Sequence, residues 1–193
     1  IGIGIDFKDG DLALRGNFAT LDGEGRIIDR RAGRKIERDD AEKISKEIEN
    51  EIKFSNSSVS VAVAPTIGHR IIVRLRASES LSSDITNTDP AYTRVDGMGI
   101  AKAVSDFMRI EKCIPMKQTE DASNAAKLVN EFTEQSLEIM KKSNVNKQRA
   151  QKNKKLLNSI LLRDAGNKYP NVKPINELHA MNFSCIVDMP VEV

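Results

Sequence analysis

The amino-acid sequence predicts an α/β domain in which one mixed β-sheet is flanked by helices. Segments with apolar residues at every second position, typical of half-buried strands, are interspersed with segments whose apolar residues recur every three or four positions, typical of amphipathic helices. The length of 193 residues, with 39% hydrophobic and 30% charged residues, fits a single globular domain over residues 1–193.

The first elements form a hairpin. Apolar or small residues occupy every second position from Leu12 to Phe18, which predicts a strand over 11–18. The stretch 22–25, Asp-Gly-Glu-Gly, predicts a turn, and 26–29 is the expected return strand.

A helix and two further strands follow. Asp39, with Glu42 three residues later, resembles a capping box that starts a helix, and isoleucines recur every fourth position up to Ile52 on one face of it. Strands are expected over 59–64 and 70–77.

The second half of the chain predicts more helix. We expect a long polar loop over 78–99, a short helix over 100–108, and a long helix capped by Thr119, with an apolar stripe from Ala125 to Met140.

The remaining elements are short. The basic segment 147–155 is expected to be helical. Strands are expected over 159–162 and 184–187, with a short helix over 174–181 between them.

The composition argues against several functions. The net charge of +2 gives no general attraction to nucleic acid, and the longest apolar stretch, Val61 to Pro65, is far too short to span a membrane. Two lone cysteines, Cys113 and Cys185, and the lack of a basic-then-apolar leader fit a cytoplasmic protein. We find no zinc motif, phosphate-binding loop or nucleophile elbow, and therefore no self-contained catalytic constellation of a common kind.

Arginine placement is the most informative feature. Arg70, Arg74 and Arg76 alternate with apolar residues on one strand, and Arg15 and Asn17 lie opposite the apolar face of another. The planar guanidinium binds phosphate or carboxylate through two hydrogen bonds, which lysine cannot do. The pattern therefore indicates an anion pocket, although a solvent-exposed strand face is the alternative interpretation.

Several blocks in this order resemble the archaeal-type cofactor-independent phosphoglycerate mutases. They are residues 11–20 (DLALRGNFAT), 26–34 (RIIDRRAGR), 69–76 (HRIIVRLR), 81–84 (LSSD), 88–90 (TDP), 128–132 (LVNEF) and 158–166 (NSILLRDAG). The stretch 92–118 fits the family poorly.

The resemblance implies an enzyme of the alkaline phosphatase superfamily that interconverts 3-phosphoglycerate and 2-phosphoglycerate in glycolysis and gluconeogenesis. Such enzymes use two divalent metals, manganese or magnesium, and a transiently phosphorylated serine, without 2,3-bisphosphoglycerate. This chain resembles their inserted substrate-binding domain. We therefore expect the phosphatase domain to be its absent partner and both chain ends to be cut points. The resemblance also implies that this chain has no catalytic residue and no metal site, so that the isolated chain is inactive.

The resemblance also implies the substrate-binding residues. These are Arg15, Asn17, Asp29, Arg30, Arg34 and Arg76. Their implied role is to hold the phosphate and carboxylate of the substrate, with Asp29 orienting an arginine, contacting a substrate hydroxyl or pairing within the hairpin. Arg31, Arg38, Arg70 and Arg74 are expected to be structural or surface residues, and Arg163 to lie near a domain junction.

Two alternatives remain from the sequence. One is a domain of another metal-dependent phosphotransferase or phosphatase of the same superfamily. The other is a nucleic-acid-binding module that uses the two basic stretches, 26–38 and 147–155. The near-neutral charge and the 4% aromatic content count against it.

Overall fold

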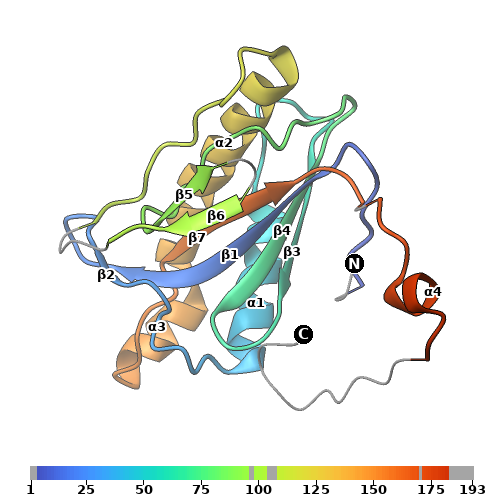
Figure 1. Ribbon diagram of the computed structural model, residues 1–193. Coiled ribbons are helices and arrows are strands. Elements are labelled where there is room, and N and C mark those ends of the chain that lie inside the picture. Colours follow the sequence, from blue (N-terminus) through green and yellow to red (C-terminus); the bar gives the residue numbers. More distant parts are fainter. Residues whose placement is uncertain (1–3, 96–97, 104–107, 170, 183–193) are drawn as a thin grey trace.

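The α/β class is confirmed by the computed structural model, which describes residues 4–95, 98–103, 108–169 and 171–182 (Figure 1). Within these residues, no helix is both long and apolar enough to cross a lipid bilayer.

A five-stranded sheet forms the centre of the chain, and its strand pairs run antiparallel. The middle strand, β1 (Leu12–Leu21), pairs with β4 (Arg70–Arg76) along one side and with β7 (Ser159–Gly166) along the other. Strand β3 (Ser60–Pro65) pairs with β4, and the short β2 (Ile27–Asp29) pairs with the end of β1. The strand that the sequence predicts first is therefore the one around which the sheet is built.

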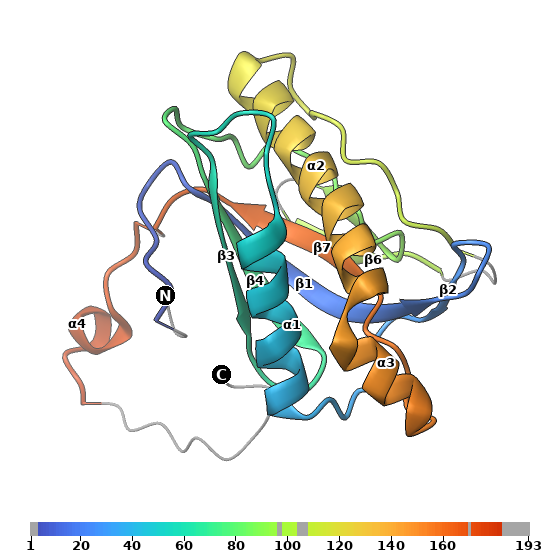
Figure 2. The same cartoon turned by 180° about the vertical axis from the view of Figure 1, so that it is seen from behind.

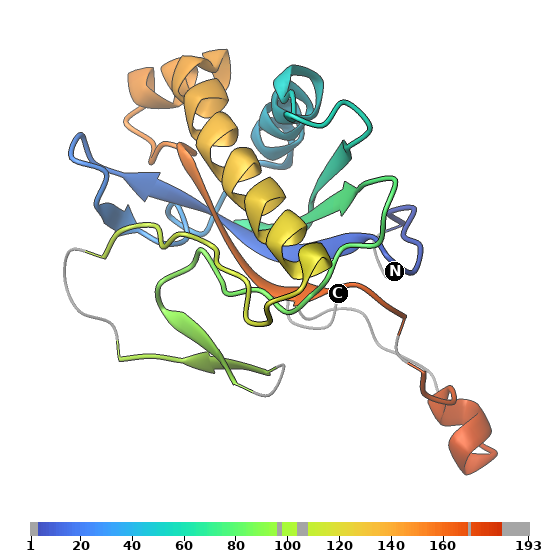
Figure 3. The same ribbon diagram turned by 90° about the horizontal axis from the view of Figure 1, so that it is seen from above.

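The two faces of the sheet are covered differently. Helices α1 (Arg38–Glu51), α2 (Glu120–Lys142) and α3 (Asn144–Gln151) lie on one face (Figures 2 and 3). A hairpin of β5 (Tyr92–Val95) and β6 (Met98–Ala101) lies over the other (Figure 3). The short α4 stands away from the sheet (Figure 1) and covers residues Ile175–His179.

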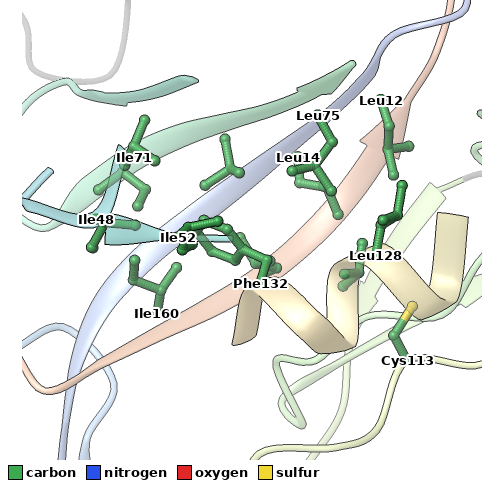
Figure 4. Packing of buried hydrophobic residues seen from close by; sticks show 14 of the residues in the cluster. Leu12, Leu14, Ile48, Ile52, Ile71, Leu75, Cys113, Leu128, Phe132 and Ile160 are labelled. Carbon is green, nitrogen blue, oxygen red and sulfur yellow. The ribbon is translucent and has the colours of Figure 1, made fainter. Parts of the chain in front are cut away.

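The hydrophobic core lies between the sheet and the helices (Figure 4). Leu14 and Phe18 of β1 and Ile71 of β4 point toward Ile48 of α1 and Phe132 of α2, and each is at most 1% exposed. These are the positions that the period-two and period-four patterns assign to the buried face, so the hydrophobic effect alone accounts for this half of the fold.

Most predicted elements are confirmed within a few residues. The strands and the turn up to Arg76, the long helix after Thr119 and the short helix after Pro174 lie where the sequence places them. The strand predicted over 159–162 is longer, since β7 continues to Gly166, and the basic helix predicted over 147–155 covers Asn144–Gln151 instead. The expected strand over 184–187 lies outside the described residues.

The segment 78–99 is not simply a polar loop, because its middle is buried and its end forms strands. Thr88 and Asp89 are completely buried. The backbone N–H of Thr88 donates to Leu162 O at 2.9 Å, and the Thr88 hydroxyl accepts from Leu162 N at 2.9 Å. Polar residues are buried here because their hydrogen bonds are made with β7, which composition alone does not reveal.

Two local predictions are wrong. The short helix expected over 100–108 begins instead as strand, since Ile100 and Ala101 belong to β6, while 104–107 lie outside the described residues. The capping box at Asp39 is absent, because the N-cap of α1 is Glu37, two residues earlier, and Asp39 pairs with Lys43 at 2.6 Å. A salt bridge one turn along the helix has replaced the cap.

Candidate functional site

An arginine-rich cavity of about 380 Å³ lies on the sheet face opposite the helices. This volume is within the range of small-molecule sites, roughly 300–1,000 Å³. We call it the arginine pocket. Its lining residues are Arg15, Asn17, Arg31, Arg34, His69, Arg70, Tyr92, Gly99, Arg163 and Asp164.

Strands β1, β4 and β7 form the floor of the arginine pocket. Arg15 lies opposite Arg163 across β1 and β7, and Asn17 lies opposite Arg70 across β1 and β4. Like charges directly opposite each other destabilise a sheet. The floor thus holds repelling cations side by side, an arrangement that a bound anion would relieve.

The loop after β2 supplies two more arginines. The Asp29 carboxylate accepts hydrogen bonds from the backbone N–H of Arg31 at 2.8 Å and of Gly33 at 3.0 Å. Arg34 then has a φ of 65°, which is unusual for a residue with a side chain. This tight turn brings the side chains of Arg31 and Arg34 to the pocket wall.

The β3–β4 turn packs directly on that loop. Gly68 has a φ of 59°, and a Cβ atom added to it would lie only 2.6 Å from the Arg34 carbonyl oxygen. Only glycine permits this approach. The contact sets His69, the next residue, against the arginines of the loop.

Arg163 is anchored by a buried carboxylate. Asp89 is completely buried, and its carboxylate accepts from Arg163 Nη1 at 3.2 Å and from Arg30 Nη2 at 2.9 Å. The Tyr92 ring lies against both guanidiniums, 4.2 Å from Arg163 Cζ and 5.3 Å from Arg30 Cζ. Buried carboxylates and aromatic faces both stabilise guanidinium groups, so this network fixes one cation of the pocket and seats the β5–β6 hairpin over it.

The charges of the pocket perturb its titratable groups. Burial, followed by the charges of Arg31 and Arg70, lowers the pKa of His69 to about 4, so the imidazole is neutral at neutral pH. Burial and the nearby Arg163 also lower the pKa of Arg15. The arginine pocket therefore resists further positive charge.

Asn17 adds a polar group at the floor. Its side chain is 3% exposed, and its Oδ1 has no hydrogen-bond partner among the described residues. An unpaired buried amide is unfavourable unless a ligand or water completes its hydrogen bonds.

The structure brings together only part of the residue set implied by the family resemblance. Arg15, Asn17 and Arg34 line the arginine pocket. Asp29 and Arg30 lie behind its wall, in the hydrogen bonds already described. Arg76 lies at the other end of β4, where Asp11 accepts from its Nε at 2.7 Å and Asp6 from its Nη1 at 2.8 Å.

Three further arginines line the arginine pocket, namely Arg31, Arg70 and Arg163. The sequence suggests structural or surface roles for Arg31 and Arg70. It suggests a position near a domain junction for Arg163. Two signals in the sequence could have found them. Arg70 is the strand arginine nearest the β3–β4 turn, and Arg163 and Asp164 are consecutive charged residues that interrupt an otherwise apolar strand.

In the second basic stretch, 147–155, two cations pair with carboxylates of helix α1 and of the residue before it. Arg149 is 3% exposed and pairs with Asp40 at 2.7 Å and Glu37 at 3.1 Å, and Lys154 pairs with the same glutamate. These contacts reduce the positive charge that this segment presents to a nucleic acid.

The described residues do not fit a metal pair. Among them, no group of three or more His, Cys, Asp or Glu side chains is placed to hold a metal ion. Cys113 is buried, and burial raises the pKa of its thiol to about 12, so the sulfur is a poor ligand at neutral pH.

Comparisons with known proteins point to one family. A family model described as 2,3-bisphosphoglycerate-independent phosphoglycerate mutase matches residues 1–146. A protein of that name from Aeropyrum pernix is 37% identical over 196 residues, which cover 99% of this chain and 45% of the relative. One from Archaeoglobus fulgidus, carrying the same name with the number 1, is 34% identical and is matched over 96% of this chain and 41% of its own length.

Solved structures agree with these matches. The cofactor-independent phosphoglycerate mutase from Thermoplasma acidophilum superposes with a TM-score of 0.69 at 28% identity, covering 86% of this chain and 40% of that one. A Pyrococcus horikoshii protein, at 20% identity and a TM-score of 0.53, shares the fold. The chain thus spans less than half the length of the relatives it matches.

Proposed function

The chain belongs to the 2,3-bisphosphoglycerate-independent phosphoglycerate mutase family, and from this premise we propose that residues 1–193 are its substrate-binding domain. In the longer protein, this domain would hold phosphoglycerate while 3-phosphoglycerate and 2-phosphoglycerate are interconverted in the cytoplasm. The observation that carries the proposal is the arginine pocket, in which five guanidiniums converge with a neutral imidazole and a buried amide.

The charge of the substrate matches this pocket. Phosphoglycerate carries about three negative charges at neutral pH, from one phosphate and one carboxylate. Planar guanidiniums bind both groups through paired hydrogen bonds and so fix orientation as well as charge. Ion pairing with the ligand would also remove the repulsion between Arg15 and Arg163.

We assign direct substrate contact to Arg15, Asn17 and Arg34, as the family resemblance implies, and add Arg31, Arg70 and Arg163. Asp29 and Arg30 act without contacting the substrate. Asp29 holds the loop that carries Arg31, and Arg30 binds the Asp89 carboxylate. Arg76 is assigned a structural role, because its guanidinium is held by Asp6 and Asp11.

The arrangement of the two chain segments that flank the sheet supports an inserted domain. Gly10 N donates to Asn167 O at 2.9 Å, and Tyr169 N donates to Asp9 Oδ1 at 2.8 Å. The rings of Phe7 and Tyr169 meet edge to face at 5.2 Å. The chain therefore enters and leaves the sheet through neighbouring segments, as insertion into another domain requires. We place the phosphorylated serine and the divalent metals, manganese or magnesium, in that other domain.

Calorimetric titration of the purified chain tests the proposal. We expect 3-phosphoglycerate to bind, and Arg15→Met to weaken binding by about tenfold, as loss of a charge-assisted contact predicts. Arg38→Met is the matched control, because Arg38 is on the exposed start of α1 and its side chain is 87% exposed.

Two results would contradict the proposal. Equal affinity of the Arg15 and Arg38 variants would remove the arginine pocket as the binding site. Conversion of 3-phosphoglycerate to 2-phosphoglycerate by this chain with manganese alone would show that it is more than a substrate-binding domain.

A further inference from the structure

One carboxylate lines the otherwise cationic and neutral arginine pocket, and it belongs to Asp164. Its position results from an irregularity in β7. Ala13 pairs with Gly166, but Arg15 pairs with Arg163, so β7 contains one residue more than β1 over this stretch. Such a β-bulge re-aims the side chains beside it.

The bulge turns two consecutive side chains to the same face. In a regular strand Arg163 and Asp164 would point to opposite faces. Here both line the pocket, while Leu162 before them and Ala165 after them belong to the hydrophobic core. Asp164 has a φ of 55°, a strained conformation for a residue with a side chain.

The surroundings hold the Asp164 carboxylate in place through only one of its two oxygens. The backbone N–H of Asp164 donates to Asn87 Oδ1 at 3.2 Å, and Oδ2 accepts from Arg163 Nε at 3.2 Å. Oδ1 accepts no hydrogen bond from the described residues, and Gly99 of β6 packs so close to it that a Cβ atom would collide with it. Arg163 shares its buried partner Asp89 with Arg30, and Oδ2 of Asp164 adds a second carboxylate contact to Arg163, so only Oδ1 is left to accept a hydrogen bond from a ligand.

A carboxylate in an anion site is unfavourable for any ligand that offers only acceptor atoms, because the two repel. It becomes favourable when the ligand presents a hydroxyl group, since an O–H···O⁻ hydrogen bond is among the stronger ones. We propose that Asp164 is the specificity-determining residue of the arginine pocket and accepts a hydrogen bond from the ligand's hydroxyl group through Oδ1. The inference rests on the proposed function and selects hydroxylated phospho-acids over bare phosphate and over their deoxy analogues.

Calorimetry on the full 193-residue chain at fixed ionic strength tests this assignment. Three probes are used. They are 3-phosphoglycerate, its deoxy analogue 3-(phosphonooxy)propanoate, which lacks the 2-hydroxyl group, and orthophosphate. We expect the wild type to prefer 3-phosphoglycerate over the deoxy analogue by about five- to tenfold, the effect of one charge-assisted hydrogen bond in a partly open site.

Two variants remove the carboxylate without disturbing the bulge. Asp164→Asn keeps the shape, and Asp164→Gly removes the side chain, and both residues accept a positive φ. We expect both to reduce the preference to within about twofold and to bind orthophosphate about two- to fivefold more tightly, because a negative charge has left the pocket. Asp84→Asn is the matched control, since its side chain is 40% exposed against 36% for Asp164 and the charge change is the same.

The outcomes separate this inference from the proposed function. If the wild type binds 3-phosphoglycerate and its deoxy analogue equally, or both Asp164 variants keep the preference, Asp164 is not the specificity residue, although the arginine pocket remains a phosphoglycerate site. If none of the three probes binds, both assignments are wrong.

Discussion

The two faces of the central sheet are made by alternate residues of the same strands, yet different interactions act on each face. Leu14 and Phe18 of β1 are buried against the helices, and Arg15 and Asn17, their neighbours in sequence, face the arginine pocket. On the first face, every apolar side chain that leaves water stabilises the fold. The second brings cations together, which destabilises the sheet, and we propose that a bound anion compensates for this.

This comparison separates the residues that stabilise the domain from those that would bind a ligand. The helix-covered face should respond to substitution in the free energy of unfolding, and the arginine face should respond in affinity. The Asp89 network shares properties of both faces. Asp89 is completely buried, as core residues are, but its carboxylate binds Arg163, which lines the arginine pocket.

The largest effect is expected on the helix-covered face. Phe132→Ala should lower the free energy of unfolding by about 3–5 kcal/mol, because it removes a fully buried ring and leaves a cavity. Urea denaturation measures this, with Ile28→Ala as the control, since Ile28 is 55% exposed. Below the unfolding transition, affinity for orthophosphate should stay the same, and a loss of affinity would mean that the faces are not independent.

Asp89→Asn should lower both the free energy of unfolding and the affinity for orthophosphate. Removing a buried charge leaves Arg30 and Arg163 without their shared partner, which should lower the free energy of unfolding by about 3 kcal/mol. Orthophosphate should also bind more weakly, because Arg163 loses its orientation even though the pocket becomes more positive. Tighter binding in this variant would show that net charge outweighs orientation. Asp6→Asn is the control, since Asp6 is a 68% exposed partner of Arg76 and its loss should leave stability nearly unchanged.

Arg15→Met should weaken binding without weakening the fold. Because Arg15 faces Arg163 across the strand pair, its removal should leave the free energy of unfolding unchanged or raise it by up to about 1 kcal/mol. Paired denaturation and titration experiments would detect this opposite behaviour. A marked loss of stability would show that the Arg15 side chain contributes to packing.

The smallest effect concerns His69. Its pKa is lowered from 6.5 to about 4 in the folded chain, so between these values the unfolded chain binds a proton that the folded chain does not. Stability should therefore fall as the pH is lowered through this window, and His69→Gln should make the decline shallower. Adding orthophosphate should move the His69 pKa upward in an NMR titration, since the anion offsets the surrounding arginines. An unchanged pKa would place the anion elsewhere.

The sequence predicts the helix-covered face well, because burial imposes a period that is visible in Leu12 to Phe18 and in the helix isoleucines. It fails where polar residues are buried by partners distant in sequence. Thr88 and Asp89 look like loop residues until their hydrogen bonds to β7 and its arginine are known. The capping box fails for a smaller reason, since Asp39 is one residue inside the helix.

The arginine pocket is only partly predictable for a similar reason. Strand alternation finds Arg15 and Asn17, and the family resemblance adds Arg34. Arg163 and Asp164 reach the pocket through a bulge, which no period of two predicts. Arg31 depends on the turn that Asp29 holds, and sequence spacing alone does not indicate which way that turn points.

The pairing of β1 with β7 also has a consequence for synthesis of the chain. Strand β1 ends at Leu21 and β7 begins at Ser159, about 140 residues later. At ribosomal rates of roughly 5–20 residues per second, β1 would wait roughly 7–30 s for this partner, with one backbone edge unsatisfied. Closing such a long loop makes folding slow. During this interval the nascent chain is most exposed to aggregation, and chaperone capture of the unpaired edge would raise the yield of folded protein.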